Sequence, residues 1–213
     1  ALRTGARLAG GEPDAAGDPV RHGAVDNATG VAAVIELARV FAAGPRPQRT
    51  LLFMALTAEE KGLQGATFYA ANPLVPLAKT AAVLNIEMLS PDGPTRDITS
   101  WGKGRVSLEN DLKRVAEAHG RTYSPDPNLE AGFFYRADHF AFARAGVPAI
   151  TVGAGLDRID GGVAGGKALR DAYFARCYHQ PCDAWTASWD ARGQAQDVAL
   201  LYALGREIAD GDA

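Results

Sequence analysis

The sequence lacks several features that would assign it to a class at once. No apolar run approaches the roughly 20 residues that a membrane-spanning helix needs, although 47% of the 213 residues are hydrophobic. No stripe of lysine and arginine is present, and the formal net charge is −3, which does not favour nucleic acid as a partner. We therefore expect neither a membrane span nor a nucleic-acid-binding surface.

The sequence also does not open with the charged start and apolar core of a secretory signal peptide. A mature or trimmed chain has this appearance. A length of 213 residues suits one α/β domain with a real core and is too short for two. We therefore expect a single domain over residues 1–213.

Cysteine is scarce: the chain holds only Cys177 and Cys182. Their spacing differs from the Cys-x-x-Cys of redox pairs. They are either two unpaired buried thiols or a local disulfide that pins the loop around His179, which would suit an oxidising compartment. Spacing alone does not decide between the two, because a disulfide requires a specific geometry.

The hydrophobic pattern alternates between strands and helices. It predicts buried strands at 50–57, 81–88 and 147–152, and helices from Asn27 to about residue 41, from Glu60 to Pro73, and at 107–119, 138–145 and 194–209, with loops at 1–24 and 157–167. This order predicts a three-layer α/β/α sandwich around a mostly parallel sheet. Ligands of such sheets bind at the carboxyl ends of the strands, which places Thr57–Glu60, Glu87–Ser90 and Gly153 on one rim.

Ionisable groups gather at that rim: Asp26, the pair Glu59 and Glu60, Glu87, and His179. Most have an ordinary explanation alone, as a helix start, first-turn acids or a solvated loop histidine. Glu87 is different, because an unpaired carboxylate at the end of an apolar strand is costly. Together, converging carboxylates and an imidazole indicate a catalytic zinc site. Adjacent acids also allow one carboxylate to bind metal while its neighbour moves protons.

Five segments, in order, carry a specific resemblance. They are Gly23-Ala-Val-Asp-Asn-Ala-Thr-Gly30, Thr57-Ala-Glu-Glu-Lys-Gly-Leu63, Asn85-Ile-Glu-Met88, Arg136-Ala-Asp-His-Phe140 and Tyr178-His-Gln-Pro181. The chain resembles, over roughly residues 10–210, the co-catalytic zinc aminopeptidases, whose clan includes glutaminyl cyclases and the transferrin-receptor ectodomain. The resemblance implies a secreted or periplasmic zinc exopeptidase with one or two zinc ions and a peptide substrate.

The resemblance also implies roles for single residues. Asp26 matches the carboxylate that bridges two zinc ions, and its bond to Asn27 matches one that is often cis. Glu59 matches the general base, while Glu60, Glu87 and His179 match metal ligands. Two further positions concern the substrate. Tyr178 matches a hydroxyl that stabilises the oxyanion, and Asp138 and His139 match a motif near the substrate pocket, for which a capped short helix is the alternative explanation.

One motif of that group is missing. A His-x-Asp should precede Asp26, but counting back from Pro13-Asp-Ala-Ala-Gly-Asp18 places Thr4 and Ala6 there, and neither binds zinc. Loop histidines are mostly solvated, so His22 is not expected to replace the ligand. We therefore expect a peptidase-like catalytic domain truncated at its N-terminus, or one whose motif has decayed, with a one-zinc site of Asp26, Glu60 and His179 conceivable.

The sequence thus predicts a zinc aminopeptidase with Glu59 as general base. Two alternatives stay open: a catalytically impaired peptidase-like domain that serves binding or assembly, and a single-zinc glutaminyl cyclase. The sequence fixes neither the side-chain preference nor the oligomeric state.

Overall fold

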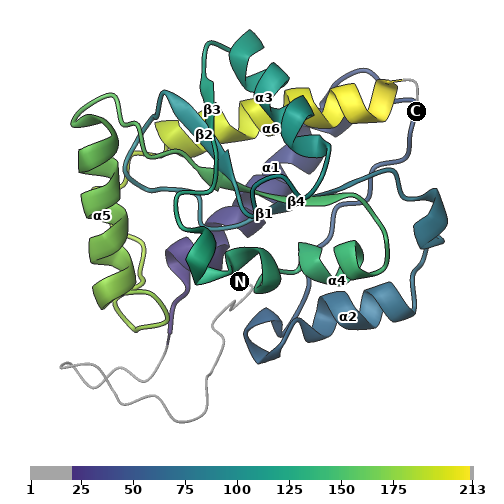
Figure 1. Ribbon diagram of the computed structural model, residues 1–213, viewed down its shortest axis with the longest axis horizontal. Coiled ribbons are helices and arrows are strands. Elements are labelled where there is room, and N and C mark those ends of the chain that lie inside the picture. The colour runs from purple at the N-terminus through teal and green to yellow at the C-terminus, as the bar shows by residue number, and fades with distance from the viewer. Residues whose placement is uncertain (1–20, 212–213) are drawn as a thin grey trace.

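The computed structural model describes residues 21–211 of the chain (Figure 1). Its helices are α1 (Thr29–Ala43), α2 (Gln64–Ala71), α3 (Leu108–Ala118), α4 (His139–Arg144), α5 (Gly162–Arg176) and α6 (Arg192–Asp210). Its strands are β1 (Val83–Ile86), β2 (Asp97–Ser100), β3 (Thr122–Ser124) and β4 (Ala149–Ala154). None of the described helices is long and apolar enough to cross a membrane. The segments Thr4–Ala6 and Pro13–Asp18 lie outside the described residues.

The strands form one mixed sheet in the order β1-β4-β2-β3. β1 pairs with β4 in parallel and β2 with β3 in parallel, whereas β2 and β4 are antiparallel. The register places Ile86 opposite Val152, so Glu87 and Gly153 follow at the same rim. The predicted mostly parallel sheet and the common rim for these two residues are confirmed.

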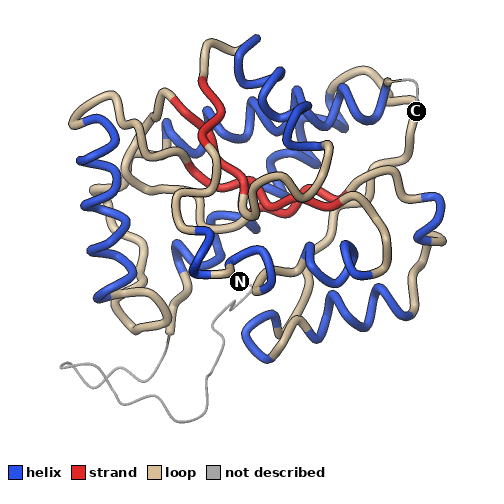
Figure 2. Tube along the Cα trace, in the orientation of Figure 1, coloured by secondary structure: helices blue, strands red, loops and turns tan. Residues whose placement is uncertain are grey.

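Helices cover both faces of the sheet (Figures 1 and 2). Successive side chains of a strand point to opposite faces. Ile150 and Val152 of β4 pack in a cluster with apolar residues of α1, α3 and α6, whereas Ala149 packs with residues of α2 and α4. The helix predictions are confirmed within a few residues, and the chain is an α/β protein with its sheet between two helical layers.

The strand predicted at 50–57 is wrong. This segment carries no strand, and no backbone hydrogen bond joins residues 51–56 to any other described residue. Leu51, Met54 and Leu56 pack against the two cores, but Leu52 and Phe53 are 50% and 39% exposed. The apolar run therefore indicates that the segment is partly buried. A strand needs, in addition, a neighbouring strand to which its backbone can form hydrogen bonds.

The glycine-rich loop predicted at 157–167 is also wrong in its second half, where α5 begins at Gly162. A Cβ atom at Gly166 would lie 2.1 Å from the carbonyl oxygen of Leu156. The glycine thus permits a close crossing of helix and backbone. Gly166 is the one buried residue of α5.

Candidate metal centre

Asp26 lies in a tight turn that the Asn27 side chain fastens to the end of β1. The Asn27 amide donates to the carbonyl oxygen of Ile86 at 3.0 Å. Its Oδ1 accepts from the N–H groups of Gly30 at 3.1 Å and Met88 at 3.2 Å, so it also bonds to the first turn of α1. The Asp26–Asn27 peptide bond is cis. Residues 24–30 and 86–88 are therefore one local unit.

Three of the predicted ligands meet at one point. His179 Nε2 lies 3.0 Å from Asp26 Oδ2 and 2.8 Å from Glu60 Oε1. One ligand atom from each of the three residues lies within 4.8 Å of the other two. Two ligand atoms of a tetrahedral zinc ion lie about 3.3 Å apart. Two carboxylate oxygens and one imidazole nitrogen at this spacing fit zinc in an open, catalytic type of site.

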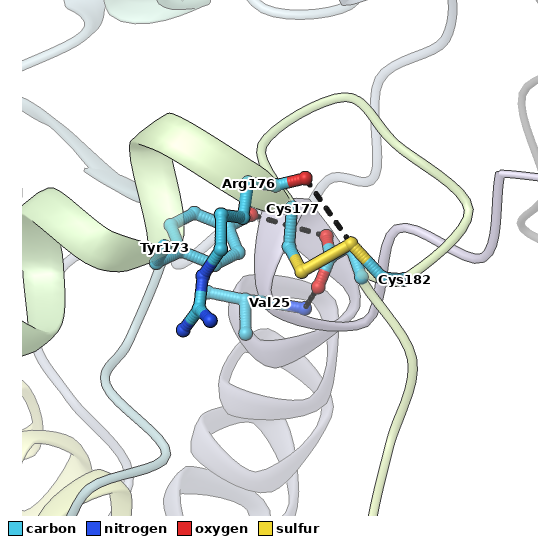
Figure 3. The surroundings of a disulfide bond; sticks show 6 residues. Val25, Tyr173, Arg176, Cys177 and Cys182 are labelled. Carbon is cyan, nitrogen blue, oxygen red and sulfur yellow. Dashed lines mark hydrogen bonds between the residues drawn. A yellow bond between two sulfur atoms is a disulfide. The ribbon is translucent and has the colours of Figure 1, made fainter. Parts of the chain in front are cut away.

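His179 lies in the sequence between Cys177 and Cys182, whose disulfide closes a short turn (Figure 3). Cys177 and Cys182 are bonded, with Cα atoms 5.2 Å apart, so the sequence alternative of two unpaired thiols is wrong. His179 has a positive φ of 59°, a conformation that is rare for a residue with a side chain. Its ring stacks on Tyr178 at 3.8 Å, and Arg21 donates to its carbonyl oxygen.

Further carboxyls lie close to these ligands, and burial together with this crowding raises the pKa of several acids of the site. Burial raises the pKa of Glu59 from 4.5 to about 8, with further contributions from the charges of Glu60, Asp138 and Asp26. Burial, with the charge of Glu60 next, raises the pKa of Asp26 to about 6. Burial, with Glu59 next, also raises that of Glu87, although the Asn85 amide donates to its Oε2 at 3.2 Å. Such crowding favours binding of a cation, which would compensate the repulsion.

Two cavities adjoin the ligands. The smaller one, of about 20 Å³, is lined by Asp26, Glu59, Glu87, Tyr178 and Arg136, together with Met88, Trp101 and Phe133. It has room for one water-sized group. The larger one, of about 670 Å³, is lined by Glu87 and by residues of α5, among them Tyr173 and Phe174. Burial and the neighbouring carboxylates raise the pKa of Tyr178, so its hydroxyl keeps its proton and can donate.

Asp138 and His139 lie at the start of α4. Asp138 makes no side-chain cap, which argues against the capped-helix explanation. Burial raises its pKa to about 6, and its charge acts on Glu59 and Glu87. His139 is fully buried; its Nδ1 is 2.7 Å from Thr151 Oγ1, and its ring meets the ring of Phe134 edge-on.

Sequence reasoning missed some residues of this region. Arg136 stands in a segment that was singled out, yet nothing in its spacing assigned it a role. Trp101 and Phe133 line both cavities. Trp101 comes from a loop and Phe133 from a short 3₁₀ helix, and neither belongs to a motif. His22 is not part of the group of three ligands formed by the described residues.

Comparison with known proteins gives a consistent picture. The model of Peptidase family M28 matches residues 9–203. A probable zinc metalloprotease of Pyrenophora tritici-repentis is 38% identical over 115 residues, covering 50% of this chain and 26% of that protein. A probable glutamate carboxypeptidase of Arthroderma benhamiae is 31% identical over 210 residues, covering 89% of this chain and 27% of that protein. The chain thus spans about a quarter of these relatives.

Solved structures share the fold. An aminopeptidase from Aneurinibacillus sp. strain AM-1 superposes with a TM-score of 0.64 at 24% identity, over 89% of this chain and 40% of that one. A Bacteroides thetaiotaomicron glutaminyl cyclase superposes with a TM-score of 0.58 at 15% identity, over 94% of this chain and 67% of that one. At these identities the likeness concerns the fold.

Proposed function

The chain belongs to peptidase family M28, and from this premise we propose that it is a zinc-dependent aminopeptidase that hydrolyses the N-terminal residue from peptides. The observation that carries the proposal is the meeting of Asp26, Glu60 and His179 at zinc-ligand spacing, directly beside Glu59. Ligands and a proton carrier in adjacent positions are what metal-assisted hydrolysis requires.

The metal ligands are Asp26, Glu60 and His179, with Glu87 as a further ligand if a second ion binds. Bound zinc supplies Lewis-acid chemistry to a water molecule and to the carbonyl group under attack. The site holds one or two zinc ions. A second ion binds only if Glu87 and Asp26 can hold it without the histidine that the His-x-Asp motif would supply.

Glu59 acts as the general base. It takes a proton from the attacking water and transfers that proton to the departing amine, so it ends each cycle in its starting state. Its position is favourable, because Glu59 and Tyr178 line the same small cavity. The Tyr178 hydroxyl donates to the carbonyl oxygen as negative charge develops there.

Asp138 and His139 serve the substrate side of the centre. The carboxyl of Asp138 adds negative charge near Glu59 and Glu87, which attracts the ammonium group of a free N-terminus and so favours exopeptidase action. The fully buried His139 holds the start of α4 in place through Thr151. The disulfide suits an oxidising compartment, which supports a secreted or periplasmic location.

Two other functions have specific support. A single three-ligand site in the described residues favours a single-zinc glutaminyl cyclase. The missing His-x-Asp instead favours a peptidase-like domain that binds partners without catalysis. A cyclase would release ammonia from a peptide with N-terminal glutamine. A binding domain would catalyse neither this cyclisation nor peptide hydrolysis.

The test is the variant Glu59→Gln, with Glu36→Gln on the exposed surface of α1 as its matched control. Zinc per chain is measured by elemental analysis, and hydrolysis with free and N-acetylated aminoacyl nitroanilides. We expect Glu59→Gln to keep its zinc and to lose activity by about 10²–10⁴-fold, whereas the control keeps both. Full activity of Glu59→Gln would refute the role of Glu59, and equal cleavage of the acetylated substrate would refute aminopeptidase action.

A further inference from the structure

A buried carboxylate outside the ligand set holds the turn that carries Asp26. Asp183 Oδ1 accepts from the N–H of Val25 at 2.8 Å, and its Oδ2 accepts from the N–H of Asp26 itself at 3.1 Å. The Ala24 N–H donates to the Asp183 carbonyl oxygen at 3.0 Å. Three successive N–H groups of the turn therefore bond to one residue, which lies 157 positions beyond Asp26 in the chain.

Asp183 is itself held from a third direction. The Tyr173 hydroxyl on α5 donates to Asp183 Oδ2 at 3.1 Å. Figure 3 shows Val25 and Tyr173 beside the disulfide, from two separate elements. Asp183 is 3% exposed. A carboxylate in such a place is stable only when donors surround it, and here the donors come from the metal-site turn and α5.

The same short segment carries a metal ligand and this carboxylate. His179 and Asp183 are four residues apart, with Cys182 between them, and its bond to Cys177 closes the turn. The Asp183 N–H also donates to the carbonyl oxygen of Gln180 at 3.1 Å. A displacement of Asp183 therefore changes the separation of His179 from Asp26, the two ligands that come from opposite ends of the chain.

We propose that Asp183 is a positioning residue of the metal centre, which fixes the backbone of Asp26 at zinc-ligand distance from His179. This inference rests on the proposed zinc site. It assigns Asp183 no contact with zinc or substrate. Hydrogen bonds that orient a ligand are worth about 10–100-fold in metal affinity in other zinc sites, and the same range is expected here.

The experiment compares Asp183→Asn with Asp197→Asn. Asp197 is an equally buried carboxylate, 3% exposed, which pairs with Arg121 at 2.7 Å and is not part of the metal centre. Zinc affinity is measured by competition with a chromogenic chelator, and the thermal midpoint of each variant is measured in excess chelator. Hydrolysis is then followed as zinc is raised to saturation.

We expect Asp183→Asn to bind zinc about 10–100-fold more weakly and to regain activity, with little change in KM, as zinc is raised. Asp197→Asn should lower the thermal midpoint and leave zinc affinity within about twofold. If Asp183 has a merely structural role, both variants will show a lower thermal midpoint and an unchanged zinc affinity. That result overturns the inference.

The Tyr173 hydroxyl offers a second variant that acts on the same carboxylate. If Asp183→Asn does not fold, Tyr173→Phe replaces it, because it removes one bond to the same carboxylate. A loss of zinc affinity of about threefold or more then supports the inference, and an unchanged affinity overturns it. If the unaltered chain binds no zinc, the proposed function itself fails, whereas tight zinc binding that is indifferent to Asp183 overturns this inference alone.

Discussion

Acid should destabilise the protein through His139, and the size of the effect follows from its surroundings. The imidazole is fully buried. Its Nδ1 pairs with Thr151, its Nε2 has no hydrogen-bond partner among the described residues, and its ring lies against Phe134. Protonation would add a positive charge and leave an N–H at Nε2 without an acceptor among the described residues. Burial accordingly lowers the pKa of His139 from 6.5 to about 4.

The sign and magnitude follow from linkage. The unfolded chain takes up a proton at His139 below about pH 6.5, and the folded chain does so only near pH 4. The stabilising contribution is therefore complete above pH 6.5 and is lost as the pH falls towards 4. At about 1.4 kcal/mol per pKa unit, the free energy of unfolding falls by about 2 kcal/mol between pH 7 and pH 5.

The assay is urea unfolding followed by tryptophan fluorescence, in excess chelator so that zinc does not contribute. Unaltered protein is compared with His139→Asn at about pH 7 and pH 5, since the difference between the two removes the effect of all other titrating groups. The advantage of the unaltered protein should shrink by about 2 kcal/mol at the lower pH. His119→Asn, at the exposed end of α3, is the control. A constant difference for His139→Asn would refute the reasoning.

Three other substitutions test the structure. Gly30→Ala should weaken zinc binding in a chelator competition, because its Cβ would lie 2.3 Å from the Asn27 Oδ1 that holds the Asp26 turn; unchanged affinity would contradict this. Arg121→Met should lower the urea-unfolding free energy by about 3–5 kcal/mol, because it leaves the Asp197 carboxylate buried and unpaired; a loss below about 1 kcal/mol would speak against it. Tyr178→Phe should reduce kcat by about 10²-fold with little change in KM, and a change confined to KM would exclude the oxyanion role.

Helices that bury one face were predictable from sequence. Burial of one face requires apolar residues at helical spacing, and that spacing is visible in the sequence. In α3, Leu108, Leu112, Val115 and Ala116 are buried, at helical spacing. Strand β2 was missed, because its buried residues are mostly polar. Its residues are Asp-Ile-Thr-Ser, all buried, and Asp97 is satisfied by the N–H of Asp157 at 2.7 Å. Buried polar strands of this kind carry no hydrophobic signal.

In the metal centre, likewise, some residues could be predicted from sequence and others could not. Asp26, Glu60 and His179 were predicted from motifs and meet in the structure. The role of Glu59 and the ligand role of Glu87 stay predictions. The residues that hold the ligands in place, Asp183 above all, could not be identified from sequence. Their contribution depends on contacts between segments more than 150 residues apart, and an aspartate in a loop has many ordinary explanations.

The margin of the sheet has a practical consequence. β1 pairs only with β4, so one side of its backbone has no strand neighbour among the described residues. Leu52 and Phe53 are exposed elsewhere in the chain. An open strand edge and exposed apolar side chains are the conditions for edge-to-edge association of copies. Aggregation of this chain should therefore rise with its concentration, so affinities and unfolding curves should be recorded over a dilution series before any variant is judged.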